Sequence, residues 1–224
     1  MIQTKKEKMR ILVFAPHNDD EVLGVGGTIA KYASYNHDVY VCEITSGNNQ
    51  ERVKKIQNEA LKAHKILGVK ETFFLGFSVV ELNNCSTIEL NAAIGRVVKD
   101  VAPEIAFIPH KGDLHIDHLV VSRSAMVALR PIPNPQLKSI FAYETLSETE
   151  WNLPTIDNAF MPNVWNEITD TIDLKIEAMK CFESQLLEFP HPRSLKAIRS
   201  LSEFRGSTIG VSNAESFMLI RNRM

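Results

Sequence analysis

The chain has 224 residues, of which 44% are hydrophobic, so it can fold as one α/β domain and bury a core without crosslinks. Its 25 basic and 27 acidic residues give a formal charge of -2, which leaves no basic surface for nucleic acid or an anionic membrane. No apolar run approaches the roughly 20 residues that a membrane-spanning helix needs.

Over residues 11–129, short apolar runs alternate with segments of helical periodicity. Continuous apolar runs are typical of buried strands, and apolar residues repeating about every 3.6 positions are typical of helices. The predicted strands cover residues 11–15, 39–44, 72–75 and 105–108. The predicted helices cover residues 22–35, 53–67, 88–101 and 117–129.

The alternation is interrupted at residues 130–135, which contain three prolines. Beyond them, residues 139–143, 164–172 and 216–220 are strand-like, and residues 174–187 form a predicted helix. Strand–helix alternation implies right-handed crossovers and a parallel sheet that is covered on both faces. The predicted fold is α/β: a single-domain, Rossmann-like, mostly parallel sheet with helices on both faces, spanning residues 1–224.

Two polar clusters directly follow the first and the fourth predicted strand. Residues 15–21 read Ala-Pro-His-Asn-Asp-Asp-Glu, and residues 110–118 read His-Lys-Gly-Asp-Leu-His-Ile-Asp-His. In open α/β sheets, ligands bind outside the carboxyl ends of the strands, at the switch point of the strand order. The first and fourth strands are neighbours at that point, so we expect the two clusters to face each other across one crevice.

The two clusters contain the donors that a catalytic metal site needs. His17 and Asp20 lie three residues apart in a strand-to-helix turn, and His118 can add a third ligand from across the crevice. Two histidines and one carboxylate leave a position open for water, as in catalytic zinc sites. Zinc lowers the pKa of that water from 15.7 to about 7. Asp19 is not needed as a ligand and can take the proton.

His115 and Asp117 complete the second cluster. A carboxylate beside an imidazole favours its charged form, so we expect His115 to be cationic and to stabilise a developing oxyanion. The acids of the first cluster also fit a plainer interpretation, in which they cap a helix near the positive end of its dipole. The presence of both clusters at neighbouring strand ends favours the metal site.

The remaining histidines carry weaker signals. His37 and His64 are expected at the surface, and His110 is expected to be an ordinary loop residue. His191 lies between two prolines and is a candidate for the pocket lining.

Gly24, Gly26 and Gly27 do not complete a dinucleotide-binding motif, because Ile29 stands where GxGxxG needs its third glycine. We therefore expect these glycines to allow close packing between a helix and the strands.

The two clusters together resemble the motifs of the PIG-L/LmbE-like N-deacetylase family. The motifs that carry the resemblance are His17-Asn18-Asp19-Asp20-Glu21, Gly26-Gly27-Thr28 and His115-Ile116-Asp117-His118. Later features are similar to the bacterial branch that acts on N-acetylglucosamine-type substrates, namely Lys175, Ser184-Gln185, Arg205-Gly206, Gly210-Val211 and Ala214-Glu215.

The resemblance implies a role for each motif residue. It implies zinc ligands at His17, Asp20 and His118, with Fe²⁺ as an alternative metal, and a catalytic group of Asp19, His115 and Asp117. The family's substrate-binding arginine is absent, because Ile56 stands three residues before Glu59. Arg52 or Lys55 is expected to replace it, and Arg205 is a further substrate-binding candidate.

The sequence thus predicts a metal-dependent N-deacetylase that hydrolyses an acetamide on a small sugar-type substrate like N-acetylglucosamine. The expected partner is this small molecule, without nucleic acid or membrane, and association with copies of itself stays open. Two alternatives remain: an amidase for another N-acylated metabolite, such as an antibiotic or thiol-conjugate intermediate, or a non-catalytic sugar-binding domain.

The expected compartment is the cytoplasm. Cys42, Cys85 and Cys181 are odd in number and far apart, as in proteins of a reducing compartment, and no signal-peptide pattern precedes the first apolar stretch.

Overall fold

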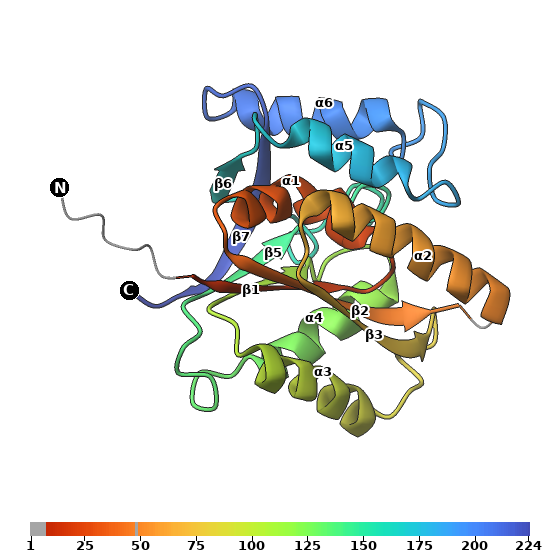
Figure 1. Cartoon of the computed structure of the whole chain (residues 1–224), viewed down its shortest axis with the longest axis vertical. Helices are drawn as coiled ribbons and strands as arrows, with labels where there is room; N and C mark the ends of the chain where they lie inside the picture. The colour runs from red at the N-terminus through yellow and green to blue at the C-terminus, as the bar shows by residue number, and fades with distance from the viewer. Residues whose placement is uncertain (1–7, 48) are drawn as a thin grey trace.

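The computed structural model describes residues 8–47 and 49–224, and within them seven strands form one sheet (Figure 1). Across the sheet the order is β3-β2-β1-β4-β5-β7-β6. The strands are β1 (Arg10–Ala15), β2 (Asp38–Ser46), β3 (Glu71–Ser78), β4 (Ile105–Pro109), β5 (Ser139–Tyr143), β6 (Val164–Glu167) and β7 (Ala214–Asn222). Pairing is parallel from β3 to β5, whereas β7 runs antiparallel to β5 and β6. The predicted fold class is confirmed.

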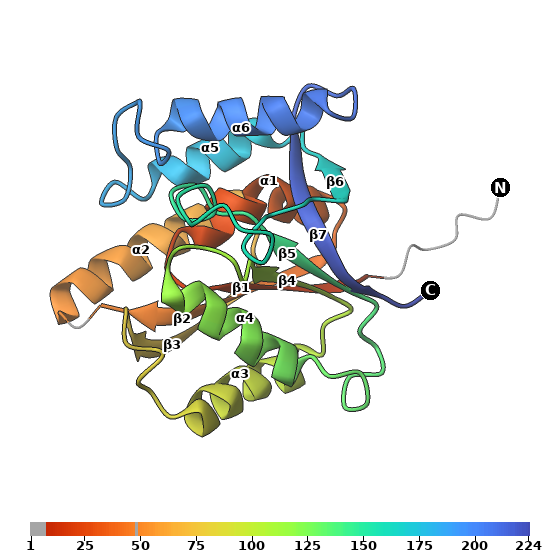
Figure 2. The same cartoon turned by 180° about the vertical axis from the view of Figure 1, so that it is seen from behind.

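Helices cover both faces of the sheet (Figures 1 and 2). One face carries α1 (Asp20–Ser34) and α2 (Gln50–Leu67), α5 (Ile172–Lys180) packs on these two helices, and α6 (Leu195–Ser207) packs against α5 and β7. The other face carries α3 (Thr87–Val101) and α4 (Ile116–Ala128). No helix in the described part of the chain is long and apolar enough to cross a membrane.

The continuous apolar run of β1 follows from these two covered faces. Successive side chains of a strand point to opposite faces, so a strand covered on both sides needs apolar residues at every position. Ile11 and Val13 belong to the core under α1 and α2, whereas Leu12 and Phe14 belong to the core under α3 and α4.

The prediction is less accurate beyond residue 160. The predicted strand over residues 164–172 ends at Glu167, because Ile172 already begins α5, and α5 ends at Lys180 rather than at residue 187. The helix α6 was not predicted from the sequence, although its signal was present. Ser194 caps it by accepting a hydrogen bond from the Ala197 N–H.

The glycines of α1 allow close packing, as expected from the sequence. A Cβ atom on Gly24 would collide with the ring of Tyr143, and one on Gly27 would collide with Ile168. The Tyr143 hydroxyl in turn donates a hydrogen bond to the Phe14 carbonyl at 2.7 Å. These contacts hold the start of α1 close to β1 and β5, which fixes the turn that carries the first polar cluster.

A buried ion pair joins the middle of α1 to the C-terminal part of the chain. Lys175 and Glu215 lie 2.6 Å apart, and Lys175 also donates to the Leu23 carbonyl at 2.8 Å. Glu215 accepts from the backbone N–H groups of Gly27 and Thr28 at 2.9 and 2.8 Å. The pair therefore binds backbone groups of α1 and fixes α5 and β7 to that helix.

Two histidines lie elsewhere than the sequence predicted. His37 and His64, expected at the surface, are 8% and 2% exposed. His37 Nδ1 accepts a hydrogen bond from the Met9 N–H, and His64 lies between Glu21 and Thr72. Apolar periodicity shows which face of a helix is buried. It does not show whether that face also contacts polar side chains, as His64 of α2 does with Glu21 and Thr72.

Candidate active site

The two polar clusters meet at one edge of the sheet. β1 and β4 are paired in parallel, so their carboxyl ends lie side by side. The turn after β1 carries His17 and leads into Asp20, the first residue of α1. The first turn of α4 carries His118, whose Nε2 lies 3.2 Å from Asp20 Oδ2. The predicted crevice is therefore present.

His17, Asp20 and His118 form a group with the geometry of a metal site. Their donor atoms all lie within 4.8 Å of one another. Asp20 Oδ2 is 3.2 Å from His17 Nδ1 and 3.2 Å from His118 Nε2. Ligands about 2.0–2.2 Å from one zinc ion have comparable separations, so the three side chains could hold such an ion with little rearrangement.

Unsatisfied buried atoms provide an independent test of this fit. Asp20 Oδ1 and His118 Nε2 are both buried and lack a hydrogen-bond partner. Buried polar atoms are nearly always satisfied, and those without a partner require an explanation. The other ring nitrogen of His118, Nδ1, lies 2.7 Å from Asp113 Oδ2. Metal-binding histidines commonly make such a contact, because it fixes the tautomer and turns the free nitrogen toward the ion.

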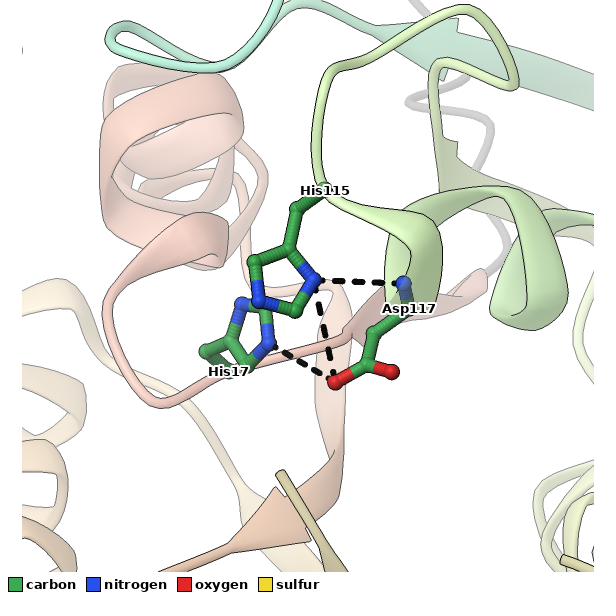
Figure 3. Close-up of side chains that lie close together, drawn as sticks. All are labelled: His17, His115 and Asp117. Carbon is green, nitrogen blue, oxygen red and sulfur yellow. Dashed lines mark hydrogen bonds and ion pairs between the residues drawn. The ribbon is translucent and has the colours of Figure 1, made fainter. Parts of the chain in front are cut away.

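Asp117 makes the corresponding contact with His17. Asp117 Oδ2 lies 3.2 Å from His17 Nε2 and also accepts from the Val80 N–H at 2.8 Å. Its distance to His115 Nδ1 is longer, 3.7 Å (Figure 3). Asp117, predicted as the partner of His115, is thus closest to a predicted metal ligand.

The charges of this group stabilise one another. Burial lowers the pKa of His17, but its hydrogen bonds to Asp117 and Asp20 outweigh burial and raise that pKa to about 9. Burial also lowers the pKa of His118, and the charge of Asp20 outweighs it and raises the pKa to about 10. Burial raises the pKa of Asp20, yet the two imidazoles hold it well below its usual range. Asp20 is thus ionised although it is fully buried. A buried carboxylate stays ionised only when a cation lies beside it.

Asp19 carries a buried carboxylate on a strained backbone and lines the pocket. Its residue is 1% exposed and its φ of 152° is one that L-residues rarely adopt. Such strain persists where the surroundings enforce it, often at functional sites. Here the Asp19 N–H donates to the His17 carbonyl and to Glu21. Burial raises the pKa of Asp19 to about 7, although Arg193 opposes the shift.

His115 differs from the sequence prediction in its charge. The Asp117 N–H donates to His115 Nδ1 at 3.2 Å, which is the cap of α4 and leaves the ring proton on Nε2. Burial, followed by the charge of His17, lowers the pKa of His115 to about 4. The prediction of a cationic His115 is therefore wrong, because burial and the charge of His17 outweigh the nearby carboxylate of Asp117.

A pocket of about 600 Å³ opens above these residues. His17, Asp19 and His115 line it, and Arg52 and Lys55 of α2 line it as well, where the sequence predicted substrate contacts. Two positive side chains at one wall favour a substrate that carries an anionic or strongly polar group on that side.

The other predicted substrate residues lie elsewhere. Arg205 pairs with Glu144 through two hydrogen bonds of 2.8 and 2.6 Å and does not line this pocket. The His191 ring packs edge-on against Trp151, also outside the pocket lining. His110, expected to be an ordinary loop histidine, is buried, and its Nε2 lies 2.9 Å from the Asn158 carbonyl.

Sequence reasoning missed three residues of the site. Asp113 orients His118, Glu148 lines the pocket, and Arg193 binds Asp19 at 3.2 Å. Asp113 lies within the second polar cluster and could have been found there, five residues before His118. Arg193 and Glu148 follow no local pattern, because each reaches the site from a loop distant in sequence.

The fold and the site define this chain as a Rossmann-like α/β protein with an open His–Asp–His group and a separate buried carboxylate at the switch point. A model of the PIG-L family, described as GlcNAc-PI de-N-acetylase, matches residues 12–129. That span is more than half of the chain and includes both polar clusters. The chain belongs to the PIG-L family.

Curated relatives support this assignment. The uncharacterized deacetylase YaiS of Escherichia coli (strain K12) is 27% identical over 190 residues, covering 82% of this chain and 96% of that protein. A probable N-acetyl-alpha-D-glucosaminyl L-malate deacetylase 2 of Bacillus anthracis is 27% identical over 194 residues, covering 80% and 83%. Among solved structures, the conserved protein TT1542 from Thermus thermophilus matches with a TM-score of 0.79 and 25% identity, covering 96% of each chain. Each of these matches covers at least 80% of this chain.

Proposed function

We propose that this chain is a zinc-dependent N-deacetylase that releases acetate from a small N-acetylglucosamine-type substrate. The observation that carries the proposal is the buried Asp19 carboxylate, held on an unusual backbone conformation, which lines the pocket beside the His17–Asp20–His118 group without belonging to it. A site that only binds a sugar has no use for such a group. Hydrolysis does, because a base must take a proton from the attacking water.

The metal-binding group fits zinc by its donors. Two imidazoles and one carboxylate leave room for substrate and water, and the pocket opens on the side of His17. When bound, zinc supplies a water of lowered pKa and polarises the acetamide carbonyl. Fe²⁺ is an alternative, since imidazole and carboxylate donors suit it too.

In this proposal the side chains of the site have three tasks: proton transfer, stabilisation of the oxyanion, and orientation of the ligands. Asp19 takes a proton from the water and returns it to the departing amine, a task that suits a carboxyl whose pKa burial raises to about 7. His115 carries its proton on Nε2, away from the Asp117 N–H, and donates a hydrogen bond to the developing oxyanion. Asp113 and Asp117 hold His118 and His17 in their orientations.

The substrate proposal rests on the pocket wall and on one relative. Arg52 and Lys55 take the place of the arginine that Ile56 replaces, and all three residues line the pocket. The Bacillus anthracis relative is named for an N-acetylglucosaminyl L-malate substrate. We propose an acetamido sugar as the reacting part.

The test combines metal analysis with product release. The purified protein is assayed for acetate release from N-acetylglucosamine, N,N'-diacetylchitobiose and N-acetylglucosaminyl malate, with its metal content measured by mass spectrometry. We expect one zinc ion per chain and acetate from at least one compound. Zinc binding without acetate release from any of them would leave the sugar-binding alternative. Acetate released only from other N-acylated metabolites would favour the amidase alternative.

A further inference from the structure

Arg193 reaches the site from the loop between α5 and α6, yet it belongs to no motif of the sequence. Its side chain is 17% exposed and lines the pocket. Nη1 lies 3.2 Å from Asp19 Oδ2 and 3.3 Å from Gln185 Oε1. Nε donates to the Ser147 hydroxyl at 2.8 Å, and Nη2 approaches Glu148 at 3.5 Å.

These contacts occupy most of the hydrogen-bonding capacity of the guanidinium group. Arginine has five N–H donors, and four bonds are formed here, including both of those that Nη1 can make. A single N–H of Nη2 is left for anything else. An arginine that binds the substrate directly would keep its fork free for bidentate contacts. The contacts of Arg193 therefore indicate that it positions other side chains of the protein rather than a bound substrate.

The two oxygens of Asp19 have different surroundings. Oδ2 accepts from Arg193, whereas no hydrogen bond to Oδ1 is formed by any described residue. Because Asp19 lines the pocket, Oδ1 is the oxygen left to face a bound water. A carboxylate on a rotatable side chain takes a proton efficiently only when the accepting oxygen is held in place.

We propose that Arg193 is the positioning residue of the general base, fixing Asp19 Oδ2 so that Oδ1 alone accepts the proton of the attacking water. The inference rests on the proposed function, in which Asp19 is that base. Arg193 also ties the orientation of Asp19 to two side chains of the pocket wall, Gln185 and Glu148. Arg193 therefore fixes the position of the Asp19 carboxylate relative to these two side chains of the pocket wall.

The experiment measures kcat, KM and zinc content for Arg193→Met and Arg193→Lys with the best substrate of the acetate-release panel. We expect Arg193→Met to lower kcat about 100-fold, the order of effect of a small misplacement of a reacting group, with KM changed less than about threefold. Zinc content is expected to stay at the wild-type level. Lysine supplies one charge without the fork and should restore only part of the rate. Arg199→Met, at an exposed pair with Asp173, is the matched control and should not lower the rate.

A double-mutant cycle with Asp19 separates positioning from other roles. If Arg193 acts through Asp19, Arg193→Met should add less than about threefold to the loss already caused by Asp19→Asn, because the two residues act as a unit. Equal loss in both backgrounds would overturn the inference, as would a raised KM with unchanged kcat. If Arg193→Met fails to fold, Arg193→Lys carries the same cycle.

The failure of the proposed function gives a different result. A wild-type chain that releases no acetate, or an Asp19→Asn variant with the wild-type rate, contradicts the base assignment itself. An active wild type with an inactive Asp19→Asn variant and a fully active Arg193→Met variant contradicts only the inference on Arg193.

Discussion

Two clusters of histidine and carboxylate take adjacent residues from the first turn of α1, Asp20 and Glu21. His17, Asp20 and His118 form one, and Glu21, Glu43 and His64 form the other. Both place three donor atoms within 4.8 Å, and His64 Nε2 lies 3.0 and 3.6 Å from the two glutamates. Spacing alone does not distinguish them, and neither do unsatisfied buried atoms, because both carboxylate oxygens of Glu43 also lack a hydrogen-bond partner.

Access and orientation distinguish the clusters. The His17 side chain is 17% exposed and lines the pocket, whereas no side chain of the second cluster is more than 3% exposed and none lines it. In the first cluster, Asp113 contacts Nδ1 of His118 and Asp117 contacts Nε2 of His17, which orients both rings. In the second, burial and the charge of Glu21 raise the pKa of Glu43 well above its usual value, so Glu43 stays protonated. These differences favour the first cluster as the metal and reaction site that we propose, and they favour a structural role for the second.

The largest expected effect comes from removing a ligand of the first cluster. Loss of a residue that hydrogen-bonds a metal ligand typically lowers metal affinity by roughly 10–100-fold. His118→Ala removes a proposed ligand itself, so zinc affinity should fall by more than that, and activity should fall with it. Zinc titration and acetate release measure the two. His64→Leu is the matched change in the second cluster and should leave zinc content unchanged. Loss of zinc from the His64 variant, with zinc retained in the His118 variant, would show that the metal binds at the second cluster.

Asp19→Asn should separate catalysis from metal binding. The amide cannot take a proton, so the rate should fall by about 10²–10⁴-fold while zinc content is retained. Asp20→Ala, one position further along, should lose both. The assignment of the base is wrong if the Asp19 variant keeps its rate, or if it loses its zinc.

His115→Ala should lower kcat by about 10²–10³-fold, the usual cost of one oxyanion donor. Zinc content should not change, since His115 is not one of the proposed ligands, whereas thermal stability should fall slightly because alanine cannot accept the capping hydrogen bond from the Asp117 N–H. Loss of zinc in this variant would make His115 a ligand and change the roles within the second motif.

Asp117→Asn should act mainly on the metal. Because Asp117 holds His17 rather than His115, zinc affinity should fall by about 10–100-fold, and excess zinc should restore most of the activity. The control is Asp113→Asn, which should behave alike through His118. A kcat defect that excess zinc does not correct would show that Asp117 serves His115 after all.

The smallest effect on activity is expected for Glu43→Gln. Glu43 keeps its proton in the folded state and loses it on unfolding above the usual value of 4.5, so the wild type loses stability as the pH rises. The variant lacks this loss and should gain up to about 1.4 kcal/mol per pH unit over the wild type in that range. Urea unfolding at pH 5.5 and pH 7.5 measures it. Equal pH dependence in both proteins would show that Glu43 is ionised.

The sequence predicted the parallel core well because its signals are local. The apolar runs of β1, β2 and β4 and the helices between them span neighbouring residues, so periodicity shows them. The C-terminal part was predicted less well. The helix α5 is short and α6 is largely polar, and both depend on contacts such as Lys175 with Glu215, which lie 40 residues apart.

The sequence by itself was enough to predict the proposed metal-binding group and the proposed base, because His17, Asp19 and Asp20 lie in one turn and His118 follows the end of a neighbouring strand. Only the tertiary structure decided what surrounds them. Arg193 and Asp19 are 174 positions apart, and Asp117 pairs with His17 across 100 positions. Such pairs leave no periodic trace in the chain, because chain order restricts local conformation, whereas charge pairing in a buried pocket depends on how the loops pack.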